Sequence, residues 1–289
     1  MKRKWIIFLG LIFTLNCFFN GCASNAKYLW RNDYKNSLSS YKDGDLSEAT
    51  QQAEKALAEA RKNNGDKSAE TGMILNTLGI YYRDQAEFEK SEASLRESLE
   101  IWNKDQAEDQ KDAAETIYNL GLLYGENGKD AEARSYFERS LACREKYYPA
   151  DDPKLVMPLN SLGVSYMKEK SYEKAQPYFD RSLSILRKNG EKDEKQMMLT
   201  LQNLSILYLA QEKYDEASVS AERNLILREK GLGKDNLEVA KALDILAMAY
   251  RAQKQISKAV PLEERAQRIY DSIHPVQAKS PLAASYTER

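Results

Sequence analysis

The segment Leu78–Tyr82, which reads LGIYY, recurs four more times along the chain at a constant interval. The later copies read LGLLY, LGVSY, LSILY and LAMAY, and the five copies begin at residues 78, 120, 162, 204 and 246, which are 42 residues apart. A fixed period of roughly 20–50 residues is the signature of stacked supersecondary units. The repeat therefore predicts an array that grows by stacking and needs no division into independent globular domains.

Each repeat reads as two α-helices joined by a short turn. Leu75, Leu78, Gly79 and Tyr82 follow the i, i+3, i+4, i+7 spacing that makes one stripe on a helix. A second stripe follows the turn, as in Ala175, Phe179 and Leu183 or Ala133, Phe137 and Leu141. No segment shows the alternation of a β-strand, so the sequence predicts an all-α fold.

Both ends of the array have an atypical repeat. At the N-terminal end Leu46, Ala49 and Ala53 match the second-helix pattern, which predicts a degenerate sixth unit over residues 28–66. At the other end Glu263 and Gln267 replace large apolar residues. Terminal units face water on one side, so these departures are typical of caps. We expect six helix pairs over residues 28–273 and a disordered tail over residues 274–289.

The repeated motif resembles the tetratricopeptide repeat. The Leu-Gly-x-x-Tyr phrase and the small residue thirteen positions after the leading Leu carry this resemblance. The 42-residue period, Pro177, Pro261 and the stretch LGKDNLEVAKALDILAMAY at 232–250 resemble the kinesin-light-chain subtype. The resemblance implies a right-handed α-solenoid of about six helix-turn-helix repeats that binds peptides on its concave side, which the first helix of each unit lines.

The first 22 residues read as a bacterial lipoprotein leader. Three basic residues precede an apolar run from Trp5 to Phe19, which is shorter than the about 20 residues of a bilayer span. Gly21 and Cys22 resemble a lipobox, so we expect a signal peptide over 1–21, a lipidated Cys22 (palmitate is one of its expected acyl chains) and a short tether over 22–27. Cys17 is the weaker candidate, and an ordinary signal peptide or an uncleaved anchor is the alternative. The residues after Cys22 favour the outer membrane, facing the periplasm.

The composition and the net charge exclude one class of protein and one class of partner. The formal net charge is −1, charged residues make up 30% of the chain, and the mean hydropathy is −0.66. These values exclude a multi-spanning membrane protein and give no basic footprint for nucleic acid. Cys143 occupies the slot that Ile101 and Ile185 hold in other repeats, so we expect it to fill the core.

Polar side chains precede the leading Leu in most repeats. On a helical wheel the two positions before that Leu point away from the stripe, and amides recur there; an amide offers both a donor and an acceptor to a peptide backbone. A solvated helix face is the alternative. We expect the basic residues among the groove positions to add selection by charge. The predicted peptide-groove residues are Asn76, Arg83, Tyr118, Asn119, Asn160, Gln202, Asn203, Lys241 and Arg251.

Apolar residues stand two positions after each leading Leu. Packing between units is favoured over an apolar groove floor for these positions, which are Ile80, Leu122, Val164, Ile206 and Met248.

No pattern for catalysis is found. The single histidine, His274, has no catalytic partner in register, and no phosphate loop, metal-ligand spacing or nucleophile elbow occurs. We expect no enzyme activity, no cofactor, no metal and no small-molecule substrate. The sequence favours a membrane-anchored scaffold for a protein or peptide partner. The alternative is a structural assembly subunit of an envelope complex, such as a pilotin-like or pilus or secretion assembly factor, that docks through folded surfaces.

Overall fold

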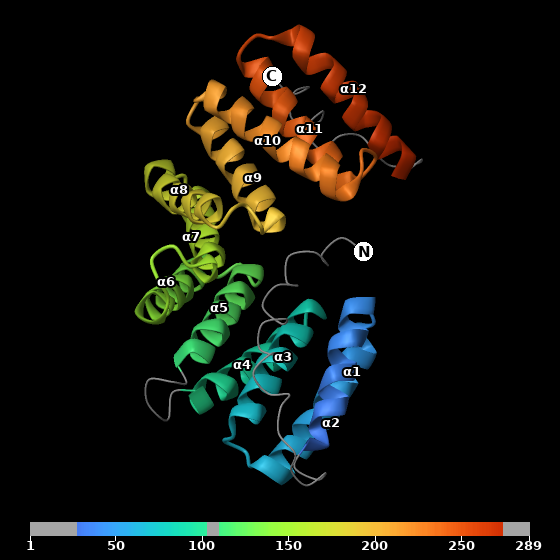
Figure 1. Ribbon diagram of the computed structural model, residues 1–289, viewed down its shortest axis with the longest axis vertical. Coiled ribbons are helices and arrows are strands. Elements are labelled where there is room, and N and C mark those ends of the chain that lie inside the picture. The colour runs from blue at the N-terminus through green and yellow to red at the C-terminus, as the bar shows by residue number, and fades with distance from the viewer. Residues whose placement is uncertain (1–27, 103–109, 274–289) are drawn as a thin grey trace. The chain divides into compact units, whose positions relative to one another are not determined.

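Twelve α-helices and no β-strand make up the part of the chain that the computed structural model describes, residues 28–102 and 110–273 (Figure 1). The helices follow one another as six antiparallel pairs, which confirms the predicted all-α repeat fold. A short 3-10 helix, η3 (Pro153–Leu155), precedes the fourth pair. The pairs are α1 (Trp30–Asp43) and α2 (Leu46–Asn64), α3 (Ala69–Asp84) and α4 (Phe88–Trp102), α5 (Gln110–Glu126) and α6 (Asp130–Tyr147), α7 (Val156–Lys168) and α8 (Tyr172–Lys188), α9 (Glu194–Ala210) and α10 (Tyr214–Leu232), and α11 (Leu237–Ala252) and α12 (Ile256–Ile273).

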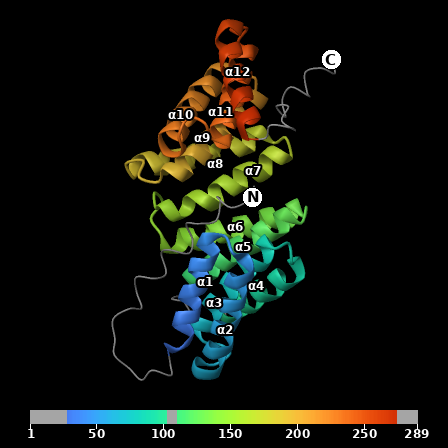
Figure 2. The ribbon, with the colours of Figure 1, turned by 90° about the vertical axis from the view of Figure 1, so that its right-hand side faces the viewer.

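The chain divides into two compact units, residues 1–147 (unit 1, α1–α6) and residues 148–289 (unit 2, α7–α12). Inside each unit a first helix packs on its own second helix and on the second helix of the preceding repeat. First helices also pack on each other: α3 on α5 in unit 1, and α9 on both α7 and α11 in unit 2 (Figure 2). Each unit therefore has a continuous layer of first helices.

Close approach of the two helices in a repeat explains the small residue after the leading Leu. A Cβ on Gly163 would lie 2.5 Å from Cζ of Phe179, so only glycine fits against that ring. Where the first helix carries Ser205 instead, the second helix carries Ala221 in place of the phenylalanine. A larger residue on the first helix is thus matched by a smaller residue on the second helix. Gly79 against Leu95 and Gly121 against Phe137 repeat the Gly163 arrangement.

The tyrosine that ends the repeated phrase joins neighbouring repeats. Tyr82 donates from its hydroxyl to Oε1 of Glu54 at 2.6 Å, on the second helix of the preceding repeat. Tyr124 donates in the same way to Glu92 at 2.7 Å. Burial and the bond to Glu92 raise the pKa of Tyr124 to about 12, so the hydroxyl keeps its proton in the stack.

Both terminal pairs are present as helices. Tyr34 of α1 is buried and hydrogen-bonds through its hydroxyl to Oγ1 of Thr77, 3.0 Å away in the next repeat. In α12, Glu263 pairs with Arg251, and Nε2 of Gln267 donates to Asp271 at 2.7 Å. The polar substitutions in the last helix thus make local contacts, as a cap requires. The leader with Cys17 and Cys22, the tether, and the tail with His274 lie outside the described residues.

We predict that Gly163→Ala destabilises the protein by about 1–3 kcal/mol, because the new methyl group overlaps the Phe179 ring. The matched control is Gly125→Ala in α5, where a Cβ would meet Ala133 at an ordinary 3.6 Å. That change should be neutral or stabilising by up to about 1 kcal/mol, since alanine is the better helix former. Thermal and urea unfolding followed by circular dichroism measure both. Equal losses in the two variants would contradict the close-approach explanation.

Candidate functional site

The predicted groove residues lie in the first-helix layers, but most of them are buried. Asn119, Asn160 and Asn203 are 3%, 3% and 9% exposed, and Tyr118 and Arg83 are buried as well. Asn76 and Gln202 are partly exposed, and only Lys241 and Arg251 are exposed. The prediction that these amides form a ladder facing solvent is therefore wrong, because Asn119, Asn160 and Asn203 are buried inside the stack.

In three repeats, the residue two positions before the leading Leu contacts a long side chain from its own second helix. Tyr270 donates from its hydroxyl to Oδ2 of Asp244 at 2.7 Å, and the Arg144 guanidinium lies 5.9 Å from the centroid of the Tyr118 ring. Gln202 accepts a hydrogen bond from Nη2 of Arg228. In all three pairs the covering residue comes 26 positions later in the sequence. A helical wheel cannot show this, because it describes directions around one helix only.

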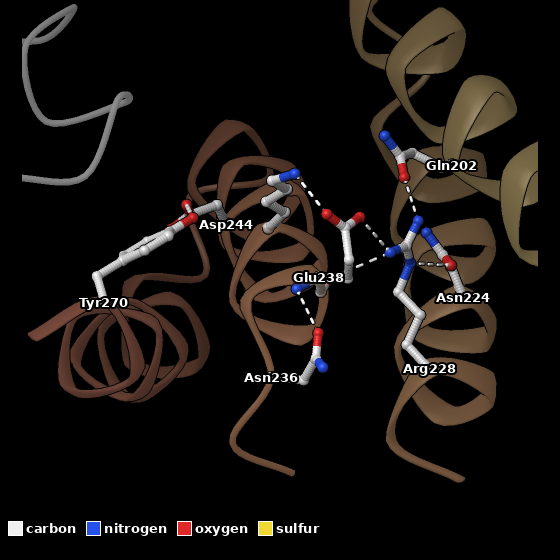
Figure 3. Close-up of polar contacts among 8 residues, drawn as sticks. Gln202, Asn224, Arg228, Asn236, Glu238, Asp244 and Tyr270 are labelled. Carbon is white, nitrogen blue, oxygen red and sulfur yellow. Dashed lines mark hydrogen bonds and ion pairs between the residues drawn. The ribbon is translucent and has the colours of Figure 1, made fainter. Parts of the chain in front are cut away.

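Arg228 is the centre of a polar network in unit 2 (Figure 3). Besides Gln202 of α9, its guanidinium donates to Oδ1 of Asn224 at 3.0 Å and to Oε2 of Glu238, in α11, at 2.7 Å. Nζ of Lys241 donates to the other oxygen of Glu238 at 2.5 Å. The network thus connects α9, α10 and α11. Burial tends to raise the pKa of Glu238, but the hydrogen bonds from Lys241 and Arg228 outweigh it, and the pKa of this carboxyl is lowered.

The cations predicted to select a charged ligand already have internal partners. Lys241 pairs with Glu238, and Arg251 pairs with Glu263. Arg83 is 1% exposed and pairs with Asp84 at 3.0 Å, while Glu126 lies 3.7 Å from its Nε. The prediction that Arg83 offers charge at a groove surface is wrong, because Arg83 is buried. Lys241 and Arg251 are exposed and already pair with a carboxylate of their own unit, so charge selection by these two residues stays a prediction.

The two units differ in one pair of amides from neighbouring first helices. In unit 1, Nδ2 of Asn119 donates to Oδ1 of Asn76 at 3.0 Å. Asn160 and Asn203 are spaced identically in unit 2, but Nδ2 of Asn160 donates instead to Oγ1 of Thr200 at 2.9 Å. Oδ1 of Asn160 and Nδ2 of Asn203 are then buried without hydrogen-bond partners. Each such atom costs about 1–3 kcal/mol, so unit 2 holds an unsatisfied acceptor and an unsatisfied donor, which we call the open amide pair.

Partly exposed apolar side chains are the feature that sequence reasoning missed. Ile80 is 5% exposed, as core packing predicts, but the equivalent Ile206 is 36% exposed, so the prediction is wrong there. A sequence signal for this surface was available: the position five residues before the leading Leu is apolar in two repeats of unit 2, at Met157 and Leu199. The apolar strip of unit 2 consists of Met157 and Val164 on α7, Leu199 and Ile206 on α9, and Ile245 and Met248 on α11, all at least partly exposed.

The described residues bear on three other kinds of feature: a metal site, a membrane-spanning helix and a reactive cysteine. Within residues 28–102 and 110–273, no three His, Cys, Asp or Glu side chains gather closely enough to hold a metal ion. No helix in the same ranges has both the length and the apolar character to cross a membrane. Cys143 is half-buried, and burial raises the pKa of its thiol, which disfavours the reactive thiolate.

Comparison with known proteins identifies the repeat. The family model described as "Tetratricopeptide repeat" matches residues 35–104, 82–146, 154–223 and 198–272. No curated protein matches the chain.

Similar solved structures share the fold at low identity. BtubC (BKLC) from P. vanneervenii is 20% identical with a TM-score of 0.70, over 81% of this chain and 94% of that one. The apo form of RapI is 17% identical with a TM-score of 0.63, over 89% and 79% of the two chains. PilW, a type IV pilus biogenesis factor, is 20% identical with a TM-score of 0.54, over 86% and 99%. At these identities the likeness shows the fold alone.

We predict that Glu238→Gln reduces the acid sensitivity of the protein. Because the folded-state pKa of Glu238 is lowered, its contribution to stability is present above the unfolded-state pKa and is lost as the pH falls through the folded value. The wild-type melting temperature should therefore fall between about pH 5 and pH 3, and the variant should start lower at neutral pH and lose less. The exposed Glu264→Gln on α12 is the control. Parallel pH profiles for Glu238→Gln and the wild type would refute this role.

Proposed function

Because the chain belongs to the tetratricopeptide-repeat family, we propose that unit 2 is a protein-interaction scaffold that binds an extended peptide segment along its first-helix layer. The observation that carries the proposal is the open amide pair. A peptide group has one N–H and one C=O, which match the acceptor on Asn160 and the donor on Asn203. Satisfying both atoms recovers free energy that the unbound protein lacks, whatever side chains the peptide carries.

The buried position of the pair has a consequence for binding. Asn160 and Asn203 are almost fully covered in the unbound structure, so the two side chains must turn toward an arriving peptide. Side-chain rotamer changes of this kind are common when partners bind, while the backbone moves little. The α-helices that carry the pair belong to the same packed layer and hold its spacing.

A second candidate function is that of an assembly subunit that docks through a folded surface. Val219 and Ile226 are 67% and 64% exposed on α10, two turns apart on one face. The equivalent pairs elsewhere are less apolar: Ala93 and Glu100, Ser135 and Ala142, Pro177 and Ser184, and Pro261 and Arg268. The likeness in fold to PilW, a pilus biogenesis factor, is compatible with this alternative.

We further propose that Cys22 carries lipid and anchors the protein to the bacterial envelope, at the outer membrane facing the periplasm. The support is the basic start, the short apolar run and the Gly21-Cys22 pair of the leader. With only residues 22–27 as a tether, the first repeat would lie within about 20 Å of the bilayer surface. The scaffold would then present its ligand site from the membrane.

We predict that a partner captured from detergent-solubilised envelopes by the full-length protein is lost when Asn160 and Asn203 are both changed to Ala. The matched control is the Asn76→Ala, Asn119→Ala double variant, which removes the hydrogen-bonded pair of unit 1. Mass spectrometry identifies the captured proteins, and circular dichroism confirms that each variant folds. Each variant removes one made hydrogen bond, but the Asn160, Asn203 variant also removes two unsatisfied buried atoms. The control should therefore lose more stability, by at least about 1 kcal/mol.

Other outcomes of the capture experiment separate the two functions. Equal capture by wild type and the Asn160, Asn203 variant would overturn the peptide-scaffold proposal. Loss of the partner only in a Val219→Ser, Ile226→Ser variant would establish the folded-surface alternative.

We predict that Cys22→Ala abolishes incorporation of an alkyne-labelled palmitate and releases the protein from the membrane fraction. Cys17→Ala should retain both the label and the membrane location, since only the residue after the cleavage point is acylated. Labelled Cys22→Ala protein would refute the anchor proposal.

A further inference from the structure

The apolar strip of unit 2 shows what kind of peptide the scaffold would accept. Equivalent positions on three neighbouring first helices carry aliphatic or methionine side chains, and Ile206 in the middle is 36% exposed. Methionine fills irregular gaps and recurs at adaptable binding surfaces, and Met157 and Met248 end the strip on its two outer helices. At the position two residues after the leading Leu, each of the three helices thus offers one apolar contact: Val164, Ile206 and Met248.

The electrostatic surroundings favour an uncharged ligand. Lys241 and Arg251, the exposed cations of the α11 groove positions, pair with Glu238 and Glu263. Arg228 is 7% exposed and engages Gln202 and Glu238. A charged side chain on the ligand would lose hydration without gaining a new ion pair, whereas an aliphatic one gains burial.

The spacing of the first helices selects a backbone conformation. Packed helices lie about 8–10 Å apart, so contacts on α7, α9 and α11 recur at about that interval. Side chains on one face of a polyproline II helix recur every third residue, at about 9.3 Å. Alternate residues of a β-strand recur at only about 6.6–6.8 Å and would fall out of step.

The open amide pair favours a ligand in the polyproline II conformation over an α-helical ligand. An α-helix also places residues seven apart at about 10.5 Å, but its backbone N–H and C=O groups are already paired with each other. A polyproline II segment makes no internal backbone hydrogen bonds, so its peptide groups can satisfy Asn160 and Asn203. Only this conformation meets both the spacing of the strip and the needs of the amide pair.

We propose that the apolar strip of unit 2 binds an uncharged polyproline II segment with an aliphatic side chain at every third position. This inference rests on the proposed peptide-scaffold function and specifies the partner for the same site. The side chains of the ligand lie against Val164, Ile206 and Met248, and its backbone engages the open amide pair. The partner protein is therefore expected to contain a Pro-rich stretch with aliphatic residues in register.

The test uses full-length protein in nanodiscs and fluorescent, end-blocked peptides of about nine residues, the length that spans three polyproline II turns. One peptide carries Leu at every third position among Pro, Ser and Gln. A second has the same composition with Leu at alternate positions, and a third carries Glu in place of Leu. Fluorescence anisotropy, with empty nanodiscs subtracted, gives the dissociation constants. We expect the first peptide to bind at least tenfold more tightly than the other two.

Matched substitutions locate the binding to the strip. Ile206→Ser should weaken the first peptide at least fivefold, while Ile256→Ser, the same change at an exposed position of α12 outside the strip, should leave its affinity unchanged. Circular dichroism melts confirm that both variants are folded.

Each remaining result overturns the inference in a distinguishable way. If the three peptides bind alike, the scaffold function stands and the selection for apolar spacing is wrong. If the Leu peptide with alternate spacing binds best, the ligand is a strand. If none binds, the proposed ligand is wrong, and the envelope capture with the Asn160, Asn203 variant independently decides the scaffold function.

Discussion

The close approach of the two helices in each repeat sets the geometry on which everything else depends. Because Gly163 has no side chain, the Phe179 ring packs directly against its backbone. In the repeat with Ser205 at this position, the facing residue is the smaller Ala221. Because a larger residue on one helix is matched across this contact by a smaller one on the other, the two helices of a pair pack closely although their residues differ. Close packing within pairs supports the layer of first helices, on which the proposed ligand site lies.

Polar groups set how one repeat is joined to the next. Tyr82 and Tyr124 reach back to carboxylates on the preceding second helix, and Arg228 reaches forward to Glu238 as well as inward to Gln202. Buried groups of this kind stabilise the stack only if each has its partners. The open amide pair of unit 2 lacks such partners, unlike the closed pair of unit 1. An unsatisfied donor and an unsatisfied acceptor on neighbouring first helices give a physical reason for a ligand there.

The function we propose is recognition of a ligand by its backbone geometry and by the spacing of its apolar side chains, with charge playing little part. The cations near the strip are neutralised by carboxylates of the same unit, so affinity would come from aliphatic burial and from two backbone hydrogen bonds. A site of this kind suits a scaffold whose partner is an extended segment of another protein.

The sequence by itself determined the all-α repeat fold, the six helix pairs and both atypical ends, because the 42-residue period and the 3.6-residue helical spacing are local properties that can be counted. It also indicated that the first helices carry the candidate site. Only the tertiary structure decided which of those residues are accessible. Asp244 and Tyr118 are covered by Tyr270 and Arg144, which arrive from 26 positions later, and Asn160 turns to Thr200 instead of to Asn203. Those outcomes depend on the reach of long side chains across helix interfaces and on competition between hydrogen-bond partners, neither of which a pattern along one helix contains.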